Sequence, residues 1–228
     1  MNLLCGSFAV VAALMYNDLT LAFWLIVAGI VFDFFDGFVA RLLHSSSAIG
    51  VQLDSLADVI TSGLAPAAVL WQVCLQTEPC WLPETWKLGY GVFVLAAFSA
   101  LRLAKFNIDE TQTVEFCGLP TPAGSLLCAS LGMLWQQGAV ALSSDGVLLI
   151  AVLTSLLLVS PIRMFALKFH GFGWRGNEVR YLFLLASIVL IIILRTYAIP
   201  VIIVLYIVVS AVRWLCMHSG NPDKAPKA

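Results

Sequence analysis

Apolar runs long enough to cross a bilayer recur along the whole chain, and they limit the fold more than any other feature. A span needs about 20 apolar residues, because the hydrocarbon core is about 30 Å thick. The chain has 228 residues, of which 61% are hydrophobic and 11% charged, whereas a soluble domain carries about 25% charge. The sequence therefore predicts an all-α, polytopic membrane helical bundle. Eight spans are expected, at residues 3–16, 19–43, 51–75, 88–106, 121–140, 146–168, 180–195 and 198–216.

No long polar linker divides the chain, so we predict one transmembrane domain at 1–216 and a short polar tail at 217–228. Ten of the twelve basic residues fall on one side of eight alternating spans, and the positive-inside rule makes that side cytoplasmic. The ten are Arg41, Arg102, Lys105, Arg163, Lys168, Arg175, Arg180, Arg213, Lys224 and Lys227, against Lys87 and Arg195 on the other side. The net charge of −1 argues against a nucleic acid partner.

The stretch DFFDGFVARLLHSSSAIGVQLDSLAD carries four aspartates although it lies mostly within the second and third apolar segments. Asp33 and Asp36 are three residues apart, and Asp54 and Asp58 are four apart, so each pair shares one helix face. A short polar turn joins the two helices, which makes them antiparallel neighbours. We therefore expect four carboxylates to converge between two helices, just below the cytoplasmic surface.

Four bare carboxylates in this position would be costly, since each intramembrane charge costs roughly 2.5–3.5 kcal/mol on insertion scales and like charges repel. Protonation, pairing with a cation such as Arg41, or a bound metal would each reduce that cost. Oxygen ligands suit hard divalent cations, and four carboxylates leave room for two ions, Mg²⁺ or Mn²⁺, with Ca²⁺ as another occupant. The stretch has no Cys or His at zinc-ligand spacing, so zinc is not expected.

Small residues lie on the same helix faces as the aspartates. Gly37 and Ala40 on the second segment, and Gly50 on the third, belong to stripes of small residues. Gly37 and Ala40 either permit tight helix packing or leave room for a ligand beside the metals. Arg41 suits a phosphate, or else anchors the helix end at the membrane interface. Metals that hold a phosphate, next to a carboxylate that can take a proton from a hydroxyl, indicate phosphoryl transfer.

These residues form the pattern Asp33-x2-Asp36-Gly37-x2-Ala40-Arg41-x8-Gly50-x3-Asp54-x3-Asp58. The pattern is similar to the signature of the CDP-alcohol phosphotransferase family at every fixed position. The resemblance implies transfer of a phosphoryl-alcohol group from a CDP-linked donor to a second alcohol, with release of CMP. It also implies a homodimer built on a six-helix catalytic core, here about 1–168, with two further helices at about 180–216.

The resemblance also implies roles for individual residues. Asp33, Asp36 and Asp54 would hold two divalent cations, and Asp58 would be both a ligand and the general base. The nucleotide and pyrophosphate site would be shaped by residues that lie on both sides of the turn, namely Gly37, Ala40, Arg41, Ser47 and Gly50.

Further stretches resemble the branch of the family that transfers the phosphatidyl group of CDP-diacylglycerol to L-serine. They are LDSLADV at 53–59, SGLAPA at 62–67, ALRLAKFN at 100–107 and GLPTPA at 118–123. Members of the family usually carry a polar stretch ahead of the first span, whereas this sequence starts almost inside that span. The resemblance places the protein in a membrane, by expectation the bacterial inner membrane, with membrane lipids and CDP-diacylglycerol around it.

The acceptor pocket is less sharply defined by the sequence. Serine has a carboxylate and an ammonium, so its pocket needs a cation and a hydrogen-bond acceptor. Arg102, Lys105 and Asn107 end the fourth span on the cytoplasmic side, and Arg163 ends the sixth, so these four are candidate serine or phosphate contacts. Positive-inside topology and anionic lipid headgroups account for the same basic residues equally well. Glycerol 3-phosphate, inositol or inositol phosphate are alternative acceptors, and a cation transporter is the alternative from another class.

Overall fold

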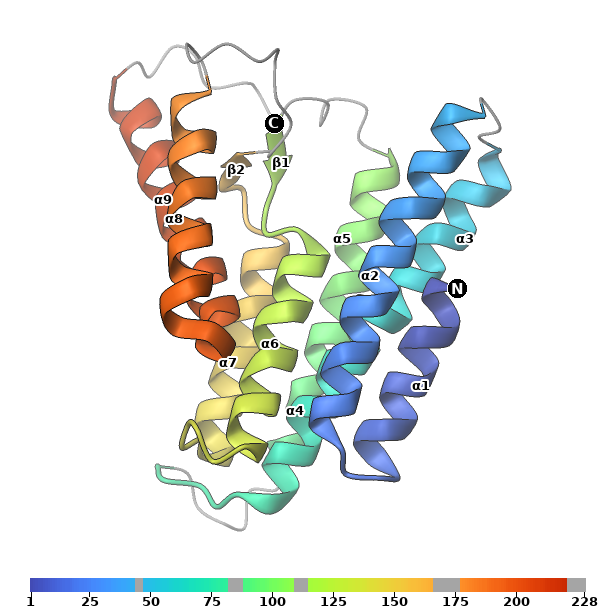
Figure 1. Cartoon of the computed structure of the whole chain (residues 1–228), viewed down its shortest axis with the longest axis vertical. Helices are drawn as coiled ribbons and strands as arrows, with labels where there is room; N and C mark the ends of the chain where they lie inside the picture. Colours follow the sequence, from blue (N-terminus) through green and yellow to red (C-terminus); the bar gives the residue numbers. More distant parts are fainter. Residues whose placement is uncertain (44–46, 82–87, 109–114, 166–176, 221–228) are drawn as a thin grey trace.

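The computed structural model describes residues 1–43, 47–81, 88–108, 115–165 and 177–220, and nearly all of them are helical (Figure 1). In chain order the elements are α1 (Asn2–Leu14), α2 (Leu19–Leu42), α3 (Ala48–Asp58), the π-helix η1 (Val59–Leu64), α4 (Ala65–Gln76), the 3₁₀-helix η2 (Leu88–Phe93), α5 (Val94–Ile108), β1 (Glu115–Cys117), α6 (Thr121–Gln136), α7 (Ser144–Leu158), β2 (Arg163–Phe165), α8 (Glu178–Leu194), the 3₁₀-helix η3 (Arg195–Tyr197) and α9 (Ala198–Gly220).

Short polar side chains set the helix boundaries. Asn17 takes a left-handed backbone conformation with φ +51°, which turns the chain from α1 into α2. The Asp18 carboxylate accepts a hydrogen bond from the first turn of α2. Ser47 caps α3 in the same way, since its hydroxyl oxygen accepts from the Gly50 amide at 3.0 Å, and Ser143 caps α7. The cap at Ser47 fixes where the helix that carries Asp54 and Asp58 begins.

The third predicted segment is one continuous helical run in three parts, α3, η1 and α4, and not one uniform helix. The π-helix η1 follows Asp58 directly, and its Thr61, Ser62 and Gly63 are buried. Such wider turns frequently occur at functional sites. This one lies between the carboxylate-bearing half of the run and the half that packs in the core.

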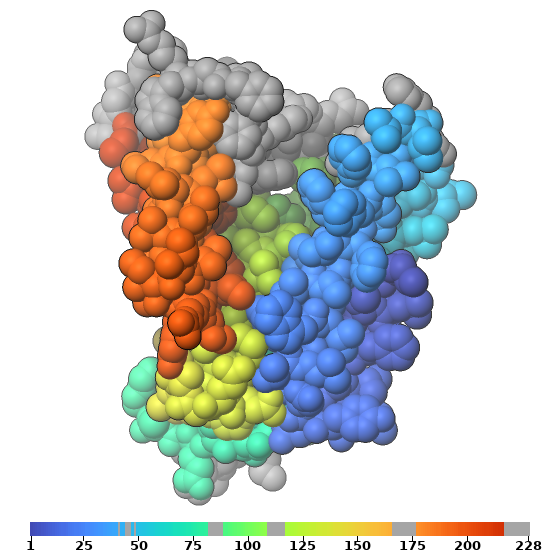
Figure 2. All heavy atoms as spheres, viewed as in Figure 1, coloured from blue at the N-terminus to red at the C-terminus, as the bar shows by residue number. Residues whose placement is uncertain are grey.

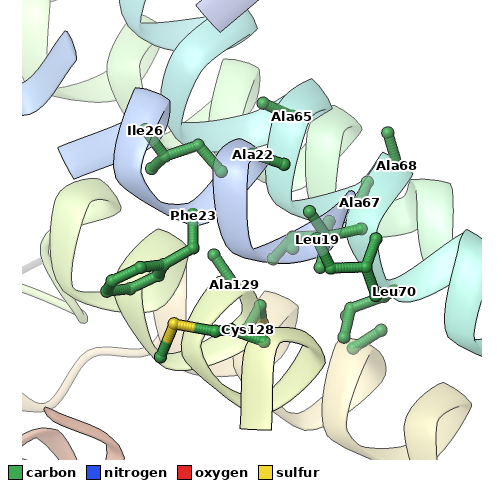
Figure 3. Packing of buried hydrophobic residues seen from close by; sticks show 14 of the residues in the cluster. Leu19, Ala22, Phe23, Ile26, Ala65, Ala67, Ala68, Leu70, Cys128 and Ala129 are labelled. Atoms are coloured by element: carbon green, nitrogen blue, oxygen red, sulfur yellow. The ribbon is translucent and has the colours of Figure 1, made fainter. Parts of the chain in front are cut away.

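The core lies where α2, α4 and α6 meet (Figure 3). Its fully buried side chains include Ala22 on α2 and three alanines on α4, and such small side chains let helices approach closely. The residues that Figure 3 labels there are Leu19, Ala22, Phe23 and Ile26 on α2, Ala65, Ala67, Ala68 and Leu70 on α4, and Cys128 and Ala129 on α6. Gly132 of α6 packs directly against Val69 of α4, since a Cβ at residue 132 would meet the Val69 side chain.

Four helical stretches of the described residues are long and apolar enough to cross a membrane, which supports an integral membrane protein. They are Leu19–Ala40, Ile49–Gln76, Gly89–Ile108 and Glu178–Cys216, with Asn2–Leu14 and Ser144–Leu158 as shorter apolar helices. The last stretch folds back at η3, where Arg195 has φ +48°, so α8 and α9 form a hairpin (Figure 1). The predicted count of eight crossings stays a prediction.

The sixth predicted segment is shorter than expected. The sequence predicted an apolar span to residue 168, but α7 ends at Leu158 because Pro161 has no N–H and disfavours helix in the residue before it. The chain then forms β2, which pairs antiparallel with β1 so that Cys117 lies opposite Arg163. The predicted spans 88–106 and 121–140 leave residues 107–120 as their connection, and residues 115–117 of it form this strand. Residues 166–168 lie outside the described part.

Gly118 fixes the turn from β1 into α6. Its φ is +76°, and an added Cβ would meet the carbonyl oxygen of Leu158. Gly138 has a similar φ of +70°, but the space around it is open.

We expect Gly118→Ala to lower the melting temperature in detergent more than Gly138→Ala does. Both variants lose about 1–2 kcal/mol of stability to left-handed backbone strain, but only Gly118→Ala adds a backbone clash. Equal shifts for the two variants would contradict this reading.

Candidate active site

Three carboxylates gather between the end of α2 and the start of α3. One oxygen from each of Asp33, Asp36 and Asp54 lies within 4.8 Å of the others. Asp33 is partly buried, whereas Asp36 and Asp54 are exposed. The spacing in sequence predicted this convergence of the two helices. Hard oxygen donors at such distances fit a divalent cation, which would offset the repulsion between the like charges.

Asp58 lies one helical turn further along α3 and is more enclosed. It lies within hydrogen-bonding reach of Asp33, and its Oδ1 accepts a hydrogen bond of 2.9 Å from the Asn2 side-chain amide. Electrostatic interactions link Asp58 to Asp54 on its own helix and to Arg102 on α5. Asp58 therefore lies between the three-carboxylate cluster and a cation on a different helix.

A first cavity of about 510 Å³ opens beside the cluster. Asp36 and Asp54 line it, as do four of the five residues predicted for the nucleotide site, Gly37, Ala40, Ser47 and Gly50. The backbone of the fifth, Arg41, lies in the last turn of α2, and its side chain lies outside the described part. A Cβ at Gly37 would have no described neighbour within 4 Å, so close helix packing does not account for this glycine. Room for a ligand does account for it.

A second cavity, of about 430 Å³, is bordered by α5, β1 and the end of α7. Arg102 and Lys105 line it. Arg102 is only 8% exposed, its Nη1 donates to the Thr121 hydroxyl at 3.3 Å, and its buried Nε has no hydrogen-bond partner among the described residues. A buried guanidinium with an unused donor beside a cavity is suited to an anionic group.

The other two candidate acceptor contacts lie nearby. Asn107 donates a hydrogen bond of 2.9 Å to the Ser55 hydroxyl, which ties the end of α5 to the acidic helix α3. Arg163 lies in β2 opposite Cys117, and Cys117 lines the second cavity. Of the four candidates, Arg102 and Lys105 therefore line one cavity. Asn107 links α5 to α3, and Arg163 lies in the strand that pairs with β1.

Two residues of the site were missed from the sequence. Thr121 accepts from Arg102, and Asn2 donates to Asp33 and Asp58. An asparagine at the edge of an apolar run is a signal by itself, because a polar side chain near membrane depth needs a partner. The partner could not be read from the pattern, since Asn2 and Asp58 are 56 residues apart.

Comparison with known proteins shows the family to which the chain belongs. The model of the CDP-alcohol phosphatidyltransferase family matches residues 1–162, and the chain belongs to this family of transferases. The predicted family is therefore confirmed, and the cation transporter is set aside. The chain is 32% identical to a Bacillus subtilis protein named CDP-diacylglycerol–serine O-phosphatidyltransferase, over 75% of this chain and 88% of that protein. A protein of the same name from Helicobacter pylori (strain ATCC 700392 / 26695) is 31% identical, over 86% of this chain and 80% of that protein. Another from Mycobacterium tuberculosis (strain ATCC 25618 / H37Rv) is 32% identical, over 98% of this chain and 81% of that protein.

Proposed function

We propose that the protein transfers the phosphatidyl group of CDP-diacylglycerol to the hydroxyl of L-serine, giving phosphatidylserine and CMP. The names of its relatives favour this reaction. The structural observation that carries the proposal is Arg102, a buried cation that lines the second cavity and interacts electrostatically with Asp58. A carboxylate held by Arg102 places the rest of a small amino acid close to Asp58.

The donor fits the first cavity. The aspartates beside it, Asp33, Asp36 and Asp54, have the ligand type and spacing for Mg²⁺ or Mn²⁺, and Asp58 is predicted as a further ligand. When bound, two such cations neutralise charge on phosphate oxygens and draw electrons from the phosphorus that is attacked. Gly37 leaves open space in which the pyrophosphate can lie close to the backbone of α2.

Asp58 is the proposed general base. Its carboxylate takes the proton of the serine hydroxyl as the serine oxygen forms a bond to the phosphorus that carries diacylglycerol. The bond from that phosphorus to the oxygen of CMP breaks, and CMP leaves from the opposite side with the electron pair. Arg102 holds the serine carboxylate, and the carbonyl groups at the end of α7, which borders the same cavity, are suited to the serine ammonium.

A different acceptor would leave this chemistry unchanged. Glycerol 3-phosphate and inositol phosphate carry a phosphate, which Arg102 and Lys105 also suit, whereas inositol is uncharged. The test is CMP release by purified protein in detergent with CDP-diacylglycerol and each alcohol in turn. One CMP per phosphatidylserine with serine alone supports the proposal. CMP release only with another alcohol would replace serine as the acceptor.

We expect Arg102→Gln to raise KM for serine by about 10- to 100-fold, because a hydrogen bond to a charged group contributes about 1.5–3 kcal/mol. The discrimination between serine and ethanolamine, which lacks the carboxylate, should fall by a similar factor. KM for CDP-diacylglycerol should stay within about twofold of the wild-type value. Initial rates measured with both acceptors check this. Lys105→Gln is the matched control on the same cavity, and because Lys105 is exposed its effect should be smaller.

We further propose that the site faces the cytoplasm of a bacterium, in its inner membrane. The end of α5, which carries Lys105, and the start of α8, which carries Arg180, lie at the same end of the bundle as the junction of α2 and α3 (Figure 1). Figure 2 shows the ends of α2 and α8 at that side of the molecule, and the turn from α8 into α9, which carries Arg195, points toward the other end. Positive-inside topology makes the first end cytoplasmic. The homodimer that the family resemblance implies stays a prediction.

A further inference from the structure

Asn2 joins three helices through one side chain. It lies in the first turn of α1 and is 3% exposed. Its Nδ2 donates two hydrogen bonds, each 2.9 Å long, to Oδ1 of Asp33 on α2 and to Oδ1 of Asp58 on α3. A side-chain amide has two N–H donors, and both are used here. Asn2 is therefore a specific bridge between two of the four aspartates.

The bridge is held rigidly from its other side. The Asn2 backbone carbonyl accepts a hydrogen bond of 3.1 Å from the Thr61 hydroxyl in η1. Two glycines allow this approach: a Cβ on Gly6 would meet Thr61, and a Cβ on Gly29 would meet the Thr61 methyl at 2.6 Å and Asn2 Oδ1 at 3.3 Å. The π-helix, α1 and α2 thus enclose Asn2, whose amide nitrogen donates to the two carboxylates.

The two carboxylates belong to different parts of the site. Asp33 is a member of the cluster that fits a divalent cation, and among the described residues Asp58 is not in that set of three. Two like charges this close repel each other, and an NH₂ group that donates one N–H to each carboxylate offsets the repulsion and limits their separation. The amide therefore orients the Asp58 carboxylate relative to that of Asp33.

We propose that Asn2 is a positioning residue of the transfer reaction, whose amide holds Asp58 in a fixed orientation relative to Asp33. This inference rests on the proposed role of Asp58 as the general base. Asn2 acts through the two carboxylates and has no chemical role of its own. Removing such an orienting partner typically costs 10- to 100-fold in activity.

The test compares Asn2→Ala with Asn17→Gly. Asn17 is an amide at the other end of α1, where it pairs with Gln76 at 2.8 Å, and glycine tolerates its left-handed backbone. We expect Asn2→Ala to lower kcat by 10- to 100-fold, with KM for serine and for CDP-diacylglycerol changed by less than about twofold. Asn17→Gly should keep the wild-type kcat. Asn2→Gln, which keeps both donors, should recover part of the loss.

A readout that does not depend on turnover is the infrared carboxylate stretch of metal-free protein labelled with ¹³C-aspartate. Loss of two N–H donors should shift the bands of two carboxylates in Asn2→Ala and leave them unshifted in Asn17→Gly. Wild-type kcat in folded Asn2→Ala would overturn the proposal. If the carboxylate bands of Asn2→Ala were unshifted and its melting temperature fell in step with its activity, the role of Asn2 would be structural only. If Asp58→Asn retained full turnover, the base assignment would fail, and the infrared comparison would still decide whether the bridge exists.

Discussion

Replacing Asp58 with asparagine should lower phosphatidyl transfer to serine by about 10²–10⁴-fold, the usual contribution of a general base. The amide has the shape of the carboxylate but cannot take the proton of the serine hydroxyl. Asp58 is joined to the rest of the site by side-chain contacts with Asn2 and Asp33, and asparagine keeps an acceptor oxygen for the Asn2 amide. The variant should therefore insert and fold. The measurement is release of CMP together with radiolabelled phosphatidylserine from purified protein.

The matched control for this substitution is Asp18→Asn. Asp18 caps α2 at the opposite end of that helix from the acidic cluster, and asparagine caps helices as well as aspartate does. The control should keep wild-type turnover and the wild-type melting temperature. Turnover of Asp58→Asn equal to that of Asp18→Asn would remove Asp58 as the base.

Removal of divalent cations should lower the transfer rate by about 10³-fold or more, because a metal contributes several kcal/mol of transition-state stabilisation. The reason lies in the oxygen donors of Asp33, Asp36 and Asp54, which lie within 4.8 Å of one another. Dialysis against a chelator followed by Mg²⁺ or Mn²⁺ should restore the rate. In Asp36→Asn, more Mn²⁺ should be needed to reach half of the maximal rate.

Binding of Mn²⁺ to metal-free protein, followed by electron paramagnetic resonance, gives a second measurement that needs no substrate. Affinity should fall in Asp36→Asn and stay unchanged in Asp18→Asn. Full activity after exhaustive chelation would contradict the metal site, whatever the effect of Asp58→Asn.

Much of this site could be predicted because its information is local. The spacings of Asp33 from Asp36 and of Asp54 from Asp58 place each pair on one face of its helix. The short turn between the two helices makes those two faces meet. The same holds for Gly37, which lies four residues after Asp33 and so on the same helix face, and which lines the cavity. Periodicity and spacing report on neighbours within a few turns, and these residues are such neighbours.

What the sequence did not predict depends on contacts between distant segments. The Asn2 bridge joins residue 2 to residues 33 and 58, and the Thr61 hydroxyl that supports it is 59 residues away from Asn2. The end of α7 at Leu158 was missed for a different reason. The apolar pattern continues past Pro161, and the backbone effect of one proline outweighs that pattern.

The π-helix after Asp58 has a consequence for how this span tolerates change in length. A π-turn is the equivalent of one residue inserted into a regular helix. Because the wider turn takes up this extra residue, a deletion between 59 and 64 would leave a regular helix in which α3 and α4 keep nearly the same rotation about the helix axis. A deletion within α3 or α4 themselves would instead rotate the two flanking parts of the helix by about 100° relative to each other. Loss of one codon in the π-helix would therefore remove its own side-chain contacts but keep Asp54 and Asp58 turned toward α2, whereas the same loss in the regular helices would turn the aspartates away from the alanine face.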